Sequence, residues 1–151
     1  MLDLFGHLQE SWKSVQQVGL AYFLTAVIGW DRENEAHSTG LRTFPIVGMA
    51  SCGYLLILGP QSDAAAQSRV LQGLITGIGF VGGGAILKEG TTVKGTATAA
   101  SVWNAGGIGA AVALERYEIA ILLAVLNLFT LRALLPVKLW IDRRRKADLK
   151  G

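Results

Sequence analysis

The sequence predicts an all-α membrane protein built as a bundle of five transmembrane helices. Of its 151 residues, 51% are hydrophobic and the mean hydropathy is +0.41, above what a soluble domain normally carries. Apolar runs of about 20 residues, the length that crosses a hydrocarbon core, recur along the chain. Residues 70–87 include six glycines, which would leave no stable helix in water but are tolerated in lipid, where backbone amides have no alternative partner.

Five runs with almost no charge define the predicted spans. They cover residues 14–30, 43–62, 70–87, 95–114 and 119–137. The fifth run contains one charged residue, Arg132, whose long stem can carry its guanidinium toward the basic end of the helix. We expect three parts: a short interfacial N-terminal segment over residues 1–14, a membrane domain over 15–141, and a basic cytoplasmic tail over 142–151.

The distribution of basic residues predicts the orientation. Residues 132–151 hold seven basic and two acidic groups, and a basic stretch directly after an apolar span marks the cytoplasmic side more often than a nucleic-acid site. An odd number of spans then places the N-terminus outside. The inner loops, 31–42 and 88–94, each carry two basic residues, whereas the outer loops, 63–69 and 115–118, each carry one. We expect no nucleic-acid partner.

Small residues predict which helices pack closely. The fourth span has Ala105 and Gly109 one turn apart, and the third span has two such pairs, Gly73 with Gly77 and Gly79 with Gly83. Because missing side chains let helix backbones approach, we expect the third and fourth spans to form the close pair. The polar residues within spans are expected mostly to form hydrogen bonds between helices; they are Thr76, Thr98, Ser101, Asn104 and Asn127.

Several functional classes lack support in the sequence. Residues 77–82 have the glycine spacing of a dinucleotide-binding turn, but the strand before it and the acidic residue about 20 positions later are both missing. No HExxH motif, no P-loop and no nucleophile with a paired base occurs, so we expect neither an enzyme nor a cofactor. Cys52 is the single cysteine, which excludes an intrachain disulfide.

The first inner loop, residues 31–42, is dense in charge for a helix end. We expect Glu33 to pair with Arg42 or Arg32, because these residues sit at span boundaries where desolvation strengthens an ion pair. The remaining charges favour an ordinary solvated loop. Asp31, Glu33 and Glu35 could supply oxygen ligands to a hard cation such as Mg²⁺, although no spacing here is diagnostic of a metal site.

Three ordered blocks resemble the MgtC/SapB family of small bacterial inner-membrane proteins, over about residues 19–131. The blocks are Arg32-Glu33 with residues 40–43, then residues 69–86, then residues 94–103. The chain departs from the family pattern at residues 96–97, at Asn104 and at residues 114–116. The positions carried over are Arg32, Glu33, Gly40, Arg42, Thr43, Arg69, Gly77, Gly79, Lys88, Gly95, Thr98 and Trp103.

The resemblance implies a role more than a mechanism. Relatives with a cytoplasmic C-terminal domain are linked to growth in low magnesium and to survival inside host cells, and some are proposed to restrain the membrane ATP synthase. This chain is similar to the short branch without that domain. The resemblance therefore implies a non-catalytic regulator or interaction protein of the inner membrane, linked to magnesium limitation or acid stress. We expect it to form a homo-oligomer, a dimer in the simplest case.

The alternative function is a small transporter or channel for Mg²⁺ or another solute, since glycine-interrupted spans often form solute sites. Against this alternative, no span has an acidic residue at its centre. The predicted functional cluster comprises Arg32, Glu33, Arg42, Thr43, Arg69, Lys88, Lys94, Trp103 and Asn104.

Overall fold

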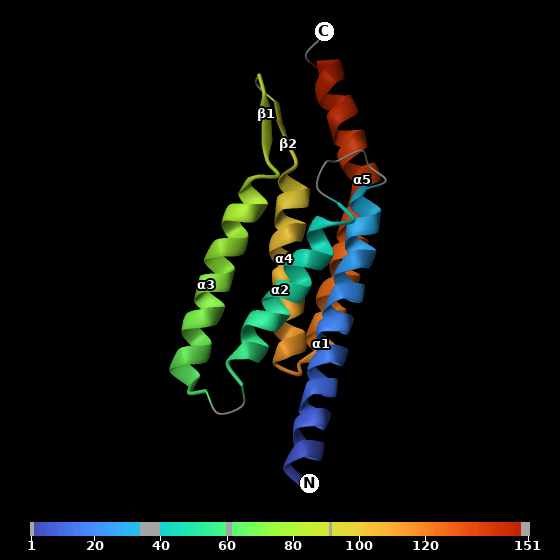
Figure 1. The fold of residues 1–151 in the computed structure, drawn as a ribbon. Coiled ribbons are helices and arrows are strands. Elements are labelled where there is room, and N and C mark those ends of the chain that lie inside the picture. The colour runs from blue at the N-terminus through green and yellow to red at the C-terminus, as the bar shows by residue number, and fades with distance from the viewer. Residues whose placement is uncertain (1, 34–39, 60–61, 91, 149–151) are drawn as a thin grey trace.

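The structure is a computed structural model that describes residues 2–33, 40–59, 62–90 and 92–148. In this part of the chain five helices account for most residues: α1 (Leu2–Glu33), α2 (Thr43–Ile57), α3 (Ala64–Gly83), α4 (Thr96–Ala113) and α5 (Tyr117–Asp148). A short antiparallel hairpin, β1 (Leu87–Glu89) with β2 (Thr92–Lys94), joins α3 to α4 (Figure 1). The predicted all-α class is confirmed.

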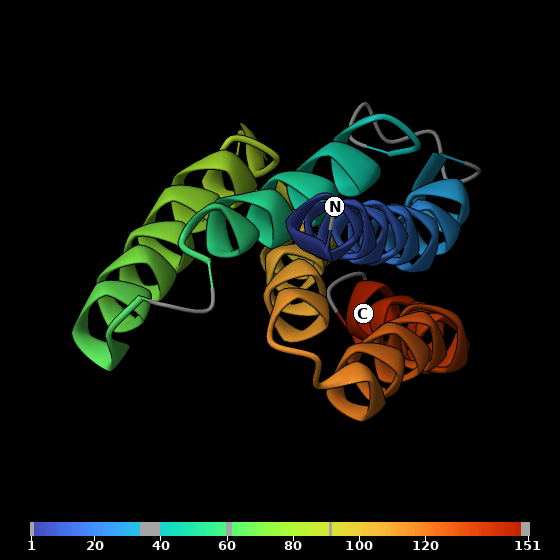
Figure 2. The ribbon, with the colours of Figure 1, turned by 60° about the horizontal axis from the view of Figure 1, so that its bottom comes forward.

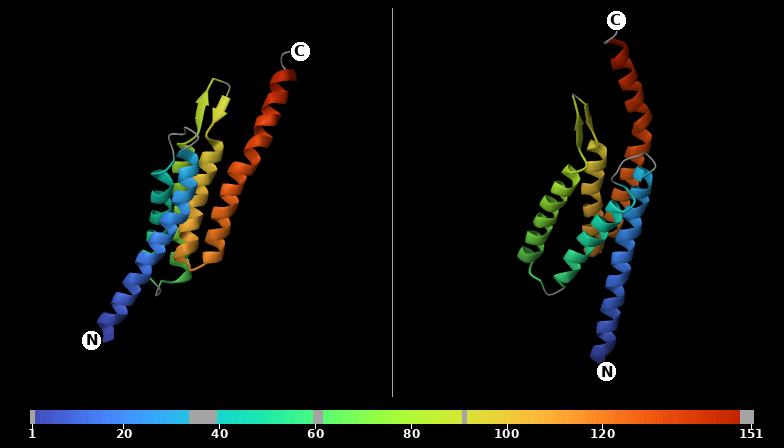
Figure 3. Two further views of the ribbon diagram at one scale, coloured as in Figure 1. Left: turned by 90° about the vertical axis from the view of Figure 1, so that its right-hand side faces the viewer. Right: turned by 45° about the horizontal axis from the view of Figure 1, so that its top comes forward.

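Consecutive helices run in opposite directions, so the two termini lie at opposite ends of the bundle (Figures 1 and 3). One end, called here the hairpin end, carries the C-terminus of α1, the β1–β2 hairpin and the C-terminus of α5. The other, called the N-terminal end, carries the start of α1, the α2–α3 connection and the α4–α5 turn. This arrangement is the one expected for five crossings joined by short loops.

Helix α4 is the centre of the bundle, because it packs against all four other helices. Its buried residues include Val102, Ala105 and Ile108, which meet Ile28 of α1 and Phe44 of α2 in one apolar core. Viewed with the N-terminal end facing the reader, α4 lies among the other helices, and α3 lies at the edge of the bundle (Figure 2). Helix α3 packs against α4 and less extensively against α2, and Gly82 is its one buried residue.

The closest helix pair is α2 with α4, which corrects the predicted pairing of the third and fourth spans. A Cβ added at Gly109 of α4 would overlap the Gly48 carbonyl oxygen of α2. On α3, by contrast, an added Cβ would have no heavy-atom neighbour within 4 Å at any of the four glycines expected to pack, Gly73, Gly77, Gly79 and Gly83. Their predicted role in packing on α4 is therefore wrong. Helix α3 reaches α4 instead through Gly82 and through Ile78, which occupies the space beside Gly106.

The helices extend beyond several of the predicted apolar runs, and the boundaries of the membrane-crossing parts stay a prediction. Helix α1 continues without a break through the described part of the predicted N-terminal segment, and α5 continues through residue 142 to Asp148. Helix α3 begins at Ala64, six residues before the predicted span, because the Asp63 side chain caps it by accepting the Ala66 amide at 2.5 Å. The expected loop 88–94 contains the hairpin. Apolar runs mark the stretch that suits hydrocarbon, not the ends of the helices.

One helix in the described part of the chain is long and apolar enough to cross a membrane by length and composition. It is the Tyr117–Ile141 stretch of α5, with 25 residues, and α2 is apolar but shorter.

Candidate functional site: a charged cluster at the hairpin end

The cluster is built around Asp31, an acidic residue near the end of α1 that is only 8% exposed. Its Oδ1 accepts a hydrogen bond from Arg132 Nε of α5 at 2.7 Å, and its Oδ2 accepts one from Arg32 Nη2 at 3.0 Å. Arg32 is buried, while the Arg132 side chain is largely exposed. The Asp31 carboxylate therefore joins α1 to α5 at the hairpin end, as an acid held between two guanidinium groups.

The ionisation of Asp31 follows from two opposed effects. Burial favours the neutral acid, but the hydrogen bonds from Arg132 and Arg32 favour the carboxylate and prevail, so they hold the pKa of Asp31 below its ordinary value. The group is thus charged at neutral pH. A carboxylate already engaged by two arginines is a poor ligand for an additional cation.

Gly40 and Glu33 shape the turn between α1 and α2. The Glu33 Oε2 accepts the Leu41 amide at 3.1 Å, and the Gly40 carbonyl accepts the Thr43 amide at 3.1 Å. A Cβ at Gly40 would displace the Glu33 carboxylate and lie 3.0 Å from the Glu33 backbone nitrogen, so a side chain there would disturb the Glu33 contact with Leu41. The predicted pairing of Glu33 with Arg42 or Arg32 is wrong: among the described residues Glu33 makes no ion pair, and Arg32 is engaged by Asp31.

The predicted functional residues are distributed over three places. Arg42 and Thr43 lie at the start of α2, and Lys88 and Lys94 lie in the hairpin, all at the hairpin end. Arg69 is exposed in the first turns of α3, toward the N-terminal end. The last two residues, Trp103 and Asn104, are in the body of α4. The structure thus brings together only part of the predicted cluster.

Polar residues of α4 hold α5 by hydrogen bonds. Ser101 Oγ donates to Asn127 Oδ1 at 2.8 Å, and Asn104 Nδ2 donates to the Leu123 carbonyl at 3.2 Å. These contacts confirm the expectation of bonds between helices. Thr76 differs, because its hydroxyl bonds within α3, to the Gln72 carbonyl at 2.9 Å.

No group of three or more His, Cys, Asp or Glu side chains that could hold a metal occurs in the described ranges. Of the three predicted metal ligands, Asp31 is bound by arginines and Glu33 by a backbone amide, and Glu35 lies outside the described residues.

Asp31 as a structural partner of Arg132 was missed from the sequence. The signal was present, because Arg132 is the one charge in the fifth apolar run and a charge at such a position needs an acidic partner at the same depth.

The helix arrangement, the one long apolar helix found among the described residues, and the Asp31–Arg132 ion pair between α1 and α5 define a small all-α bundle protein with a segment suited to crossing a membrane. Comparison with known sequences identifies the family of this protein. The family model described as MgtC family matches residues 18–140, and the chain belongs to that family.

Named relatives cover a large part of the chain. SrpB of Synechococcus elongatus is 32% identical over 126 residues, which cover 74% of this chain and 69% of SrpB. YhiD of Escherichia coli, which bears the name of a candidate magnesium transporter, is 31% identical over 120 residues, 74% of this chain and 56% of YhiD. MgtC of Brucella abortus is 34% identical over 89 residues, 59% of this chain and 37% of MgtC. The chain therefore spans between 37% and 69% of the length of these relatives. No solved structure matches the chain.

Proposed function

We propose that this protein is a non-catalytic, multi-pass protein of the bacterial inner membrane that regulates or contacts another membrane component under magnesium limitation or acid stress. The observation that carries the proposal is the Asp31 cluster, since the buried Asp31 carboxylate binds Arg32, the first residue of a block that resembles the family. Membership of the MgtC family supports the link to magnesium.

The surface of the bundle supports five crossings. Large apolar side chains are exposed on every helix; Phe23 of α1 is 68% exposed, Ile57 of α2 79% and Phe80 of α3 87%. Such a surface is unfavourable in water and favourable in hydrocarbon. Because the helices lie side by side, a bilayer that surrounds the apolar stretch of α5 would surround much of its neighbours too (Figure 3).

Charge supports the orientation with the C-terminus in the cytoplasm and the N-terminus outside. Lys88, Lys94 and the basic C-terminal turns of α5 lie at the hairpin end, where the positive-inside bias expects them. Terminal reporter fusions test this orientation: both ends on one side of the membrane would contradict it.

The polar groups of the bundle favour a regulator over a transporter. Buried Thr25, Ser101 and the side chain of Asn104 are bonded to groups of the bundle itself, and the Asp31 carboxylate is bound by two arginines. The groove of about 670 Å³ between α2 and α3 is lined almost entirely by apolar residues. A hard cation, which requires oxygen ligands, gains little there. The alternative, transport of Mg²⁺ or another solute, draws its support from the name of YhiD.

Two measurements separate these functions. Purified protein in liposomes is assayed for Mg²⁺ uptake with an internal dye, and a strain lacking the gene is tested for growth at low magnesium with the wild type or with Asp31→Asn. The regulator predicts no uptake above empty liposomes and no rescue by Asp31→Asn expressed at the wild-type level. Specific uptake would favour the transporter instead.

The proposed partners are the lipid bilayer, a second copy of this chain, and a membrane protein such as an ATP synthase, which the family resemblance implies. The four exposed glycines of α3 support self-association, because their backbone is open to a second helix.

A further inference from the structure

Helix α5 continues beyond the part that packs in the bundle. Its last buried residue among those described is Leu131, and every described side chain from Leu134 to Arg144 is exposed. In the described part of the chain, α5 runs past the end of α1, and none of the other helices lies beside its last turns (Figures 1 and 3). Residues 134–148 are called here the α5 extension. The bundle does not cover this segment, so its surface is open to a partner outside the chain.

The α5 extension carries exposed basic residues without an acidic partner. No ion pair joins Lys138, Arg143 or Arg144 to an acidic side chain of the described residues. The Arg144 guanidinium lies over the Trp140 ring, with its central carbon 3.9 Å from the ring centroid. A guanidinium stacked in this way keeps the N–H groups at its edge open, and two of them can bond a phosphate in parallel.

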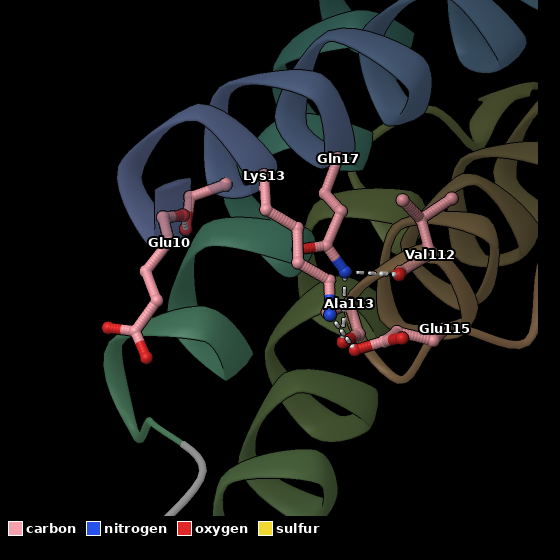
Figure 4. Close-up of polar contacts among 7 residues, drawn as sticks. Glu10, Lys13, Gln17, Val112, Ala113 and Glu115 are labelled. Carbon is pink, nitrogen blue, oxygen red and sulfur yellow. Dashed lines mark hydrogen bonds and ion pairs between the residues drawn. The ribbon is translucent and has the colours of Figure 1, made fainter. Parts of the chain in front are cut away.

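Two basic residues at the opposite end of the bundle differ, because acidic side chains of the chain itself balance them. Lys13 Nζ donates to Glu115 Oε1 at 2.5 Å (Figure 4), and Arg116 Nε donates to Glu118 Oε1 at 2.6 Å. The excess of positive charge lies instead at the end of α5, since residues 132–151 hold seven basic and two acidic groups. This end therefore favours a negatively charged partner.

The spacing of the basic residues indicates how such a partner surrounds the helix. At 3.6 residues per turn, Lys138, Arg143 and Arg144 are separated by about 100–140° around the helix axis. They are distributed around the whole circumference of the α5 extension. A protein or a nucleic acid that approaches from one side would meet only part of this charge. A layer of lipid headgroups surrounds a helix that crosses it and meets all three residues.

The length of α5 gives the depth of these residues in a bilayer. Its apolar stretch, Tyr117–Ile141, has 25 residues and rises about 37 Å, which exceeds the hydrocarbon core of about 30 Å. A core that begins at Tyr117 ends about 20 residues later, near Val137. Trp140 and Arg144 then lie within about 11 Å of that boundary, so the long arginine side chain can reach the headgroup layer. Tryptophan is typical of this depth.

We propose that the α5 extension binds anionic phospholipid headgroups, such as phosphatidylglycerol, on the cytoplasmic face of the membrane. Arg144, held on the Trp140 ring, contacts a headgroup phosphate, and Lys138 and Arg143 attract further anionic lipids around the helix. The inference rests on the proposed membrane location but not on a role in magnesium limitation. Because the terminal reporter fusions test the location separately, the two proposals can fail independently.

The test measures hydrogen–deuterium exchange over residues 138–148 of the full-length protein in nanodiscs. One kind of disc contains phosphatidylcholine alone, and the other contains about one third phosphatidylglycerol. Each basic residue near an anionic surface strengthens binding roughly fivefold, so three should slow exchange at least about tenfold in the anionic discs. The difference should disappear in about 1 M NaCl, where the Debye length is about 3 Å. Equal exchange in the two kinds of disc would overturn the proposal.

A nucleic-acid partner is tested in the same assay with a short DNA duplex added to the phosphatidylcholine discs at equal ionic strength. We expect the duplex to slow exchange over residues 138–148 much less than phosphatidylglycerol does. Slowing by DNA that equals or exceeds the effect of the lipid would overturn the proposal in favour of nucleic acid.

Variants of Arg144 separate the stacked guanidinium from charge in general. Arg144→Gln should reduce the slowing by phosphatidylglycerol roughly fivefold, and Arg144→Lys, which keeps the charge but not the planar donor, should reduce it less. The matched control is Arg116→Gln, which removes one exposed guanidinium at the opposite end of the bundle and should leave exchange over residues 138–148 unchanged. Wild-type exchange in α4 shows that each variant is folded. Full slowing in Arg144→Gln, or an equal reduction in Arg116→Gln, would contradict the proposal.

Discussion

Helices α3 and α4 both contain glycines one turn apart, yet the two helices stand in opposite surroundings. In α4, a side chain at Gly106 or Gly109 would overlap atoms of a neighbouring helix. In α3, a side chain at Gly77 or Gly83 would meet nothing within 4 Å, and Gly82 alone is packed. Helix α4 is largely buried and central, whereas α3 stands at the edge with most of its surface open (Figure 2).

The difference shows that a row of small residues permits another helix to approach closely but does not determine which helix packs there. In α4, the missing side chain of Gly109 lets the α2 backbone approach, so that the Gly48 carbonyl oxygen lies where a Cβ would stand; the missing side chain of Gly48 itself leaves room for Thr25 of α1. Across from Gly73 and Gly77 lies the open groove between α2 and α3, so these glycines leave their backbone accessible. Substitutions in the two helices should therefore differ in magnitude and even in sign.

The largest effect is expected for Gly109→Leu. Its side chain would have to displace the α2 backbone at Gly48, so we expect a loss of at least about 3 kcal/mol in the free energy of unfolding, or failure to accumulate folded protein. The measurement is thermal or denaturant unfolding in detergent, followed by circular dichroism.

The matched variant is Gly77→Leu, with the same added side chain on an exposed face of α3. It should unfold at or near the wild-type midpoint. A comparable loss in both variants would mean that α3 packs more tightly than the structure shows.

The second effect concerns the tie between α1 and α5, in the well-packed part of the bundle. Asp31→Asn keeps the shape but removes the charge that both arginines bind, and should cost about 1–3 kcal/mol in the free energy of unfolding. Because the folded pKa of Asp31 is below its unfolded value, its contribution is present above about pH 4 and is lost as the pH falls through the folded pKa.

The check is a series of unfolding midpoints between neutral pH and pH 3 for the wild type and Asp31→Asn. The two curves should converge as the pH falls. Glu118→Gln serves as control, since its partner Arg116 is exposed and surface pairs contribute little. A constant difference at every pH would show that the Asp31 charge does not stabilise the fold.

The class of the fold could be predicted from the sequence, since uncharged runs locate four of the five helices within a few residues at one or both ends. The hairpin could not, because residues 87–94 carry no strong alternation and the strands are only three residues long. The pairing of α2 with α4 could not be predicted either, because the glycine pattern places Gly109 at a close contact without showing which helix lies against it.

The site was predicted in part. Charge density pointed to the end of α1, but the choice among its acidic residues was wrong, because proximity in sequence suggested Arg42 while the tertiary fold brought Arg132 from 101 residues away.

A smaller effect is expected where α3 does touch α4. An added methyl at Gly82 would lie 2.9 Å from the Ala99 carbonyl oxygen, so Gly82→Ala should cost about 1–2 kcal/mol. Because α3 is held mainly by this contact and by Ile78, the loss should be local. Hydrogen–deuterium exchange should rise in α3 and stay at the wild-type level in α1 and α2. An equal rise in exchange across all helices of Gly82→Ala would instead show that α3 unfolds in the same cooperative unit as the other helices.

The smallest effect has the opposite sign. Gly77→Ala adds a methyl to open space in a helix, so the folded chain should gain about 0.5–1 kcal/mol. If α3 also contacts a second copy through its bare backbone, the same methyl should lower the dimer fraction seen by cross-linking in native membranes. Gly53→Ala on α2, where an added Cβ likewise meets nothing within 4 Å, is the matched control and should change only the stability. An unchanged dimer fraction in Gly77→Ala would show that the exposed face of α3 is not the dimer interface. A loss of stability in the same variant would mean that this face is packed within the chain.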